Sequence, residues 1–145
     1  MEMTFSRQFL DVAGILDYLV GALALIVSIL ITAAGAVVMN NPELAAEMPS
    51  TFGSCTVLII GIAIAAGSIF TIFYGYLERA AAKDPAKIMP VWVLSLLSVI
   101  LGAGSIIFDF VKHVDLADMN SSFISLAFSI LIFIFANNTK KEAGK

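Results

Sequence analysis

The side chains best suited to proton or cation chemistry in this sequence lie together at Asp109, Lys112 and His113. On a helix, residues three and four positions after an acid lie on the same face and within its reach. A histidine changes its charge near neutral pH, so an acid beside a histidine could form the mouth of a proton or cation path. Ordinary pairing of charges at a membrane interface predicts the same spacing, and we favour that interpretation.

A second acid and base, Asp17 and Arg79, flank the first two apolar stretches. If those stretches are antiparallel helices, the start of one meets the end of the other, and Asp17 can reach Arg79. Glu78 is the other acid near this arginine, but adjacent residues on a helix point in different directions. The sequence therefore predicts an Asp17–Arg79 ion pair, which we interpret as structural.

Other reactive groups are too few to form a catalytic or metal-binding cluster. Cys55 is the only cysteine and His113 the only histidine, so neither an intramolecular disulfide nor a cysteine–histidine metal site can form within one chain. Membrane enzymes show a group of such residues, or a nucleophile with its base. The eight basic residues are too scattered for a nucleic-acid surface. We therefore expect no enzymatic activity, no cofactor or metal and no nucleic-acid partner.

Four long apolar stretches must position these residues. The chain of 145 residues is 60% hydrophobic and 13% charged, whereas soluble domains carry about 25% charged residues. A helix of about 20 apolar residues crosses the hydrocarbon core of a bilayer, which is about 30 Å thick. The sequence therefore predicts an all-α integral membrane protein, a single domain over residues 1–145 with four transmembrane helices. The predicted spans are residues 18–39, 54–77, 90–110 and 119–136.

The segments that flank the spans have patterns of their own. In residues 4–17, apolar side chains recur at helical spacing with charged ones between them. This segment forms either an amphipathic helix on the membrane surface or an extension of the first span, and we favour the extension because no clear break separates the two. We expect Asn120, Ser121 or Ser122 to cap the fourth span. Residues 137–145 form a cytoplasmic tail.

Basic and aromatic residues both indicate the orientation. Connections between the spans are short, which predicts antiparallel neighbours in an up-down-up-down bundle. In that topology seven of the eight basic residues fall on one side, and only Lys112 falls on the other. Cytoplasmic loops carry an excess of Lys and Arg, and Tyr and Trp collect at membrane interfaces. Every Tyr and Trp lies at the basic ends of the spans, namely Tyr18, Tyr74, Tyr76 and Trp92. The sequence therefore predicts that both termini are cytoplasmic, in a bacterial or archaeal cytoplasmic membrane.

Small residues form seams along the first two spans. In lipid, the close packing of helices depends on small residues that let the backbones approach. A seven-residue period predicts a left-handed crossing, and a four-residue period favours a tighter, often right-handed one. The first span has the seven-residue period, at Gly14, Gly21, Ser28 and Gly35, and the second has the four-residue period, at Ala63, Gly67, Thr71 and Gly75.

Serine residues mark one face of each of the last two spans. Serine hydroxyls in a transmembrane helix bond either to their own helix or across to a neighbour. We favour helix packing as the role of these faces, with a polar path between the spans or contact with a partner protein as the alternatives. The residues are Ser95, Ser98, Gly102 and Ser105 in the third span and Ser121, Ser125 and Ser129 in the fourth.

Together these patterns favour a structural or accessory role. The centre of every span is uncharged, so no buried charge offers a coupling site for ion-driven transport. We expect a small protein that packs within the lipid bilayer, as a homo-oligomer or with another membrane protein. The alternative is a small channel or transporter whose path is lined by serine and glycine residues between the helices.

Overall fold

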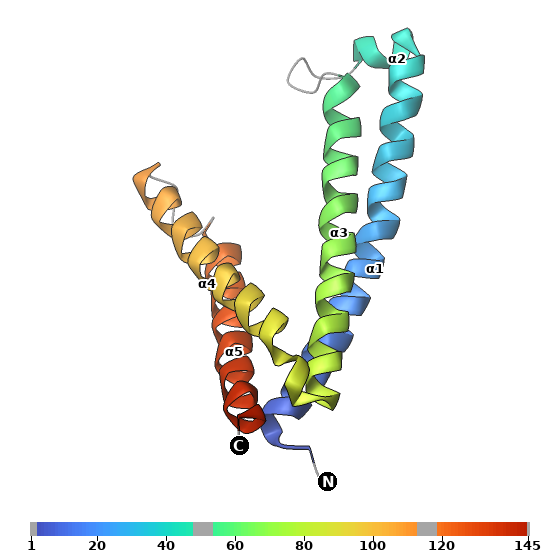
Figure 1. Ribbon diagram of the computed structural model, residues 1–145. Coiled ribbons are helices and arrows are strands. Elements are labelled where there is room, and N and C mark those ends of the chain that lie inside the picture. Colours follow the sequence, from blue (N-terminus) through green and yellow to red (C-terminus); the bar gives the residue numbers. More distant parts are fainter. Residues whose placement is uncertain (1–2, 48–53, 113–118, 145) are drawn as a thin grey trace. The chain divides into compact units, whose positions relative to one another are not determined.

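Figure 1 shows the protein as a computed structural model, in which residues 3–47, 54–112 and 119–144 are described. Within these ranges all regular secondary structure is helical. Four of the helices are long and apolar enough to cross a membrane, which confirms the predicted number of long apolar helices. The elements are α1 (Phe5–Asn40), α2 (Pro42–Glu47), α3 (Ser54–Lys83), the 3-10 helix η1 (Pro85–Lys87), α4 (Ile88–Val111) and α5 (Asn120–Ala143).

All four long helices are longer than the hydrocarbon core of a bilayer, and α1 and α3 exceed it most. At a rise of 1.5 Å per residue, the 36 residues of α1 extend over about 54 Å and the 30 residues of α3 over about 45 Å, against a hydrocarbon core of about 30 Å. α1 runs without a break from Phe5, so residues 5–17 continue the helix of the first predicted span. α5 continues to Ala143, so most of the predicted tail is helical as well.

The helix ends follow from local chemistry. α3 stops at Lys83 because Asp84 and Pro85 begin a new element: the backbone of Asp84 is extended, and its side chain accepts a hydrogen bond from the Ala86 N–H at 3.1 Å. Pro85 stands in the first turn of η1, where its missing N–H costs nothing. α5 differs from expectation, because its N-cap is Met119, which makes no side-chain capping hydrogen bond.

The chain divides into two compact units, and the division falls within α1 and α3. Unit 1 comprises Met1–Ile15 and Tyr76–Lys145, and unit 2 comprises Leu16–Gly75. In unit 1, α4 and α5 lie side by side and η1 packs against both (Figure 1). Trp92 meets Phe133 near one end of this helix pair, and Gly102 faces Leu126 farther along, so the two helices run antiparallel.

The core of unit 1 draws on four helices. α1 contributes two buried side chains, α3 three, and α4 and α5 the remainder, so the ends of α1 and α3 are integral parts of this unit. Most of these side chains are apolar, but a carboxylate and two hydroxyl groups are buried among them. The buried residues are Leu10, Ala13, Glu78, Ala81, Ala82, Ile88, Val91, Ser95, Ile106, Met119, Ile132, Ala136 and Thr139.

Unit 2 is built on the pair of α1 and α3, which lie side by side (Figure 1). A Cβ placed on Gly21 would lie 2.6 Å from Cγ1 of Ile72, and one placed on Gly35 would lie 2.8 Å from the backbone nitrogen of Leu58. These contacts pair the start of one helix with the end of the other, so α1 and α3 also run antiparallel. Their backbones approach so closely that an alanine does not fit at either glycine without a shift.

Most of the apolar surface of the long helices is exposed. In the most apolar stretch of each long helix, only 11–17% of the residues are buried inside the structure. Exposed side chains such as Leu23, Ile59, Leu101 and Ile124 cover the outside of the helices. Soluble proteins do not expose continuous apolar surface of this extent, whereas lipid or neighbouring transmembrane helices cover it at no cost.

Candidate functional site

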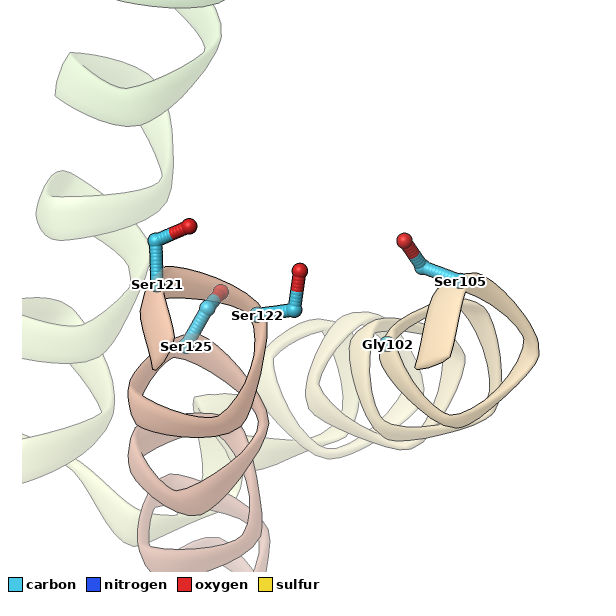
Figure 2. A pocket seen from close by; sticks show the side chains of 5 residues that line it. All are labelled: Gly102, Ser105, Ser121, Ser122 and Ser125. Atoms are coloured by element: carbon cyan, nitrogen blue, oxygen red, sulfur yellow. The ribbon is translucent and has the colours of Figure 1, made fainter. Parts of the chain in front are cut away.

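A polar hollow lies between α4 and α5 in unit 1. It has a volume of about 340 Å³. Figure 2 shows the hydroxyl groups of its serines directed to the same side of the helix pair. The lining residues are Gly102, Ser105, Ser121, Ser122 and Ser125. Four of these five belong to the serine and glycine faces identified in the sequence, and Ser122 is added by the structure. We call this hollow the serine pocket.

The serine pocket exists because small side chains leave space where two helices meet. A Cβ on Gly102 would lie 3.2 Å from Cδ1 of Leu126, so this glycine allows α4 and α5 to come close beside the pocket. The rest of the serine faces lies elsewhere. Ser95 is buried and donates a hydrogen bond to the Trp92 carbonyl at 3.0 Å, Ser129 donates to the Ser125 carbonyl at 3.0 Å, and Ser98 is exposed.

Asp109 joins the two helices beside the pocket. The Ser122 hydroxyl donates a hydrogen bond of 3.4 Å to Oδ2 of Asp109, which is long for this type of bond. Ser122 lies in the first turn of α5, whose free N–H groups carry partial positive charge. Met119 provides no side-chain cap for this turn. The carboxylate of Asp109, on the neighbouring helix α4, places negative charge near the first turn of α5.

Lys112, the other described member of the predicted acid–base cluster, makes its contact away from this carboxylate. Nζ of Lys112 lies 4.3 Å from the centre of the Phe108 ring, in a cation–π contact. Among the described residues Lys112 and Asp109 form no salt bridge with each other. His113 lies outside the described residues. What the structure brings together around Asp109 is therefore a set of serine hydroxyls.

Arg79 forms a salt bridge with Asp11, which lies six residues before the predicted partner Asp17. Its Nε lies 3.1 Å from Oδ1 of Asp11, and both side chains are about one-third exposed, at 38% and 31%. Asp17 belongs to unit 2. Such a partly exposed pair contributes about 0–1 kcal/mol to stability. The interaction therefore fixes the register of α1 against α3 in unit 1 more than it stabilises the fold.

Arg7 binds the end of α3. Its guanidinium donates a hydrogen bond of 2.7 Å from Nε to the Ala82 carbonyl, and another of 2.7 Å from a terminal nitrogen to the Lys83 carbonyl. Carbonyls in the last turn of a helix have no partner within the helix and carry partial negative charge, so a cation is well placed there. The sequence offers one signal for this contact: a helix that ends at Asp84-Pro85 needs donors for its last carbonyls.

The first turns of α1 also contact the end of α5. The Phe135 ring packs on Phe5, with centres 5.6 Å apart, and on Phe9, with centres 4.2 Å apart. The Thr4 hydroxyl donates a hydrogen bond of 3.0 Å to Oε2 of Glu142. With Arg7, these contacts make residues 4–11 the segment that links the ends of α3 and α5 in unit 1.

Glu78 is an ionisable residue whose burial the sequence analysis did not predict. It is fully buried, and it is the only buried ionisable side chain in the part of the chain that the structure describes. Its position next to Arg79 does direct it to another side of α3, as expected, but that side faces the core of unit 1. A buried carboxylate is expensive to desolvate, and in a membrane protein such a residue is a candidate functional residue.

At the same end of unit 1, Lys140 lies over Trp92. Nζ of Lys140 is 3.6 Å from the centre of a Trp92 ring, and this indole also packs on Phe133 at 5.9 Å between ring centres. Nε1 of Trp92 is buried and makes no hydrogen bond, and the same is true of the Thr139 hydroxyl. The indole N–H beside Lys140 is therefore a buried donor without an acceptor.

The helix-packing seam of unit 2 has a seven-residue period on both helices. Gly21, Ser28 and Gly35 of α1 are buried, as the predicted seam requires, and Gly14 is buried within unit 1. On α3 the buried small residues are Gly61, Ser68 and Gly75. This set shares only Gly75 with the predicted four-residue stripe.

The remaining members of that stripe lie away from α1. Ala63 and Gly67 are exposed and Thr71 is partly exposed. A Cβ on Gly67 would meet no other described atom within 4 Å. Two equal periods let one left-handed crossing continue along both helices, which explains why the seven-residue set faces α1.

Hydroxyl groups in unit 2 bond to their own helices. Ser28 donates to the Leu25 carbonyl, Thr32 to the Ser28 carbonyl, and Ser68 to the Ile64 carbonyl, each at 2.7 Å. A hollow of about 420 Å³ beside this seam is therefore apolar in character. Its lining residues are Ser28, Ile29, Thr32, Ala33, Ile62 and Ala65. The hydroxyl groups that line this hollow therefore differ from those of the serine pocket, because both of them bond to carbonyls of their own helix.

Comparison of the chain with protein-family models, with curated proteins and with solved structures finds no match. Within residues 3–47, 54–112 and 119–144, no three His, Cys, Asp or Glu side chains are grouped so that they could hold a metal ion. The functional argument therefore rests on the helices and their side chains.

Proposed function

We propose that this chain is a small polytopic membrane protein that acts as a structural or accessory subunit through helix packing in the bilayer. The observation that carries the proposal is the low burial of the long helices, of which 11–17% of the most apolar residues are covered within the chain. Extended apolar faces remain for lipid and for the helices of a second copy or of another membrane protein. The charged residues lie outside the uncharged central stretches of the long helices, which suits a protein whose exposed surface is mostly in lipid.

Small residues on the outside of α3 support association with another helix. Ala63 and Gly67 are exposed one turn apart, and the space at Gly67 is open. A small-xxx-small stripe on an exposed face lets a second helix approach its backbone closely. The partner would be a membrane-embedded helix, from this chain or from another.

Association can be tested by native mass spectrometry of the protein extracted in a mild detergent. The proposal predicts a species heavier than the monomer, containing a second copy or another membrane protein. Gly67→Leu should reduce it. Gly104→Leu is the matched control, because Gly104 also faces open space but belongs to no predicted seam. Recovery of the monomer alone, without any co-purifying chain, would contradict the proposal.

The serine pocket favours a second function, a small channel or transporter with a path between α4 and α5. Hydroxyl groups of Ser105, Ser121 and Ser125 open into one hollow, with the carboxylate of Asp109 bonded to Ser122 beside it. Such groups can replace part of the hydration shell of a cation or of a small polar solute. A proton or cation flux in reconstituted liposomes that Asp109→Asn abolishes would establish this function over the accessory one.

A further inference from the structure

Several lysines gather at one end of unit 1. Lys83 lies in the last turn of α3, Lys87 ends η1, and Lys140 and Lys141 lie in the last turn of α5. Because η1 packs against α5, Lys87 is close to the end of that helix. We call these four residues the basic end of unit 1.

The charge of the basic end is only partly compensated. Lys87 pairs with Asp84 at 3.6 Å, and that pair is well exposed, at 65% and 48%. Within the described ranges the other three lysines form no salt bridge. Glu142, the nearest acid in sequence to Lys140 and Lys141, accepts a hydrogen bond from Thr4. An anion approaching this end would therefore meet lysines without a carboxylate partner.

Trp92 adds a hydrogen-bond donor beside Lys140, and Thr139 is a second buried donor that precedes Lys140 in the sequence. The Trp92 N–H is a donor only, and its nitrogen is buried without an acceptor. The Thr139 hydroxyl, in the residue before Lys140, is likewise without a partner, and Thr139 is 0% exposed. Lys140 lies directly over the Trp92 ring, and its flexible side chain can move aside. An oxygen atom of a ligand bound beside Lys140 would supply an acceptor that the protein itself lacks.

We propose that the basic end of unit 1 binds the phosphate group of an anionic phospholipid, with Lys140 as the principal contact and Trp92 as a neighbouring donor. This inference rests on the proposed function, in which the chain is a polytopic membrane protein. Trp and Lys at a helix end lie at the depth of the lipid headgroups, and anionic lipids attract lysines there.

Apolar side chains next to Trp92 favour a lipid over a soluble phosphate compound. Met89 and Val93, one turn apart on α4, are 48% and 42% exposed. They flank Trp92 in the sequence and offer an apolar surface along which an acyl chain can lie. A soluble phosphate compound would gain nothing from that surface.

The test uses the fluorescence of Trp92, which is the only tryptophan in the chain. The full protein is reconstituted in phosphatidylcholine liposomes containing either brominated phosphatidylglycerol or brominated phosphatidylcholine at the same low mole fraction. We expect brominated phosphatidylglycerol to quench Trp92 more strongly. This difference in quenching measures how strongly the site prefers phosphatidylglycerol to phosphatidylcholine. We expect that preference to fall about fivefold in Lys140→Gln, which is the effect of one lysine near an anionic surface.

Lys112→Gln is the matched control. It removes the same charge and a cation–π contact of the same kind, but Lys112 lies over Phe108 at the opposite end of α4. Equal quenching by the two brominated lipids would overturn the proposal, and so would an equal loss of preference in both variants. Competition by soluble glycerol phosphate at millimolar concentration would overturn the lipid as the source of the phosphate.

If the chain did not span the membrane, the experiment would give a result different from failure of the lipid site alone. In that case the protein would be released from liposomes by alkaline carbonate, whichever lipid is present. Retention of the protein together with equal quenching would overturn the lipid site alone.

Discussion

Replacement of Arg7 tests whether the first turns of α1 hold the end of α3. Arg7→Met keeps most of the side-chain length and removes both hydrogen bonds to the carbonyls of Ala82 and Lys83. A hydrogen bond to a charged group contributes about 1.5–3 kcal/mol. The bond to Lys83 is exposed, so water can replace it, whereas the bond to Ala82 is partly buried. We therefore expect the free energy of unfolding to fall by about 2 kcal/mol, close to the value of one such bond.

The assay is a titration from mild detergent into sodium dodecyl sulfate, followed by the fluorescence of Trp92, which lies in the same unit as Arg7. Lys87→Met is the control, because it removes a cation from an exposed pair that is worth about 0–1 kcal/mol. Arg7→Lys should recover part of the loss, since an ammonium group can reach one carbonyl but not two. A loss in Arg7→Met no greater than that in Lys87→Met would refute the reasoning.

Three further predictions use the same titration, which is followed by circular dichroism for unit 2 because Trp92 lies in unit 1. Gly21→Ala should destabilise unit 2 by about 1–3 kcal/mol, because its Cβ would lie 2.6 Å from Cγ1 of Ile72 and 3.0 Å from the Ser68 carbonyl oxygen. Gly67→Ala, at a position with open space, should be neutral or stabilise by up to about 1 kcal/mol. The opposite order of the two effects would show that α1 packs on another face of α3. Phe135→Ala should lower the free energy of unfolding by about 3–5 kcal/mol, since it removes a large ring and two aromatic contacts. A decrease of less than about 1 kcal/mol would contradict the packing of α1 on α5. Asp109→Asn should cost about 0.3–1 kcal/mol through the lost interaction with the first turn of α5, and an increase in stability would contradict that role.

The long helices could be predicted from the sequence because their signal is local. A run of about 20 uncharged residues has few alternatives to a transmembrane helix, and each predicted span lies almost entirely within one long helix of the structure. The seven-residue spacing of Gly14, Gly21, Ser28 and Gly35 in α1 could also be read from the sequence. The serine faces of α4 and α5 anticipated four of the five residues of the serine pocket.

Contacts that depend on the register between two helices could not be predicted from the sequence in this way. α3 carries two sets of small residues, one at Gly61, Ser68 and Gly75 and one that includes Ala63 and Gly67. Either set could face a neighbour, and only the opposing surface of α1 decides between them. Pairing of Arg79 with Asp11 depends equally on how far one helix is displaced along the other.

The burial of Glu78 and the hydrogen bonds of Arg7 arise from the meeting of several helix ends. Each residue looks ordinary in its own segment, as a charge next to an apolar stretch. Glu78 becomes buried because parts of α1, α4 and α5 complete the core around the end of α3. Arg7 becomes a partner for carbonyls because α3 ends at Lys83, beside α1.

Accessibility of single cysteines in intact cells tests the membrane-spanning arrangement most directly. Cys55 is exposed at the start of α3, and Ala86 is exposed in η1 at the other end of that helix. The account predicts that a membrane-impermeant maleimide labels Cys55 from outside intact cells, and labels Ala86→Cys, in a Cys55→Ser background, only after the membrane is permeabilised. Labelling of both positions in intact cells, or of Ala86→Cys alone, would contradict it.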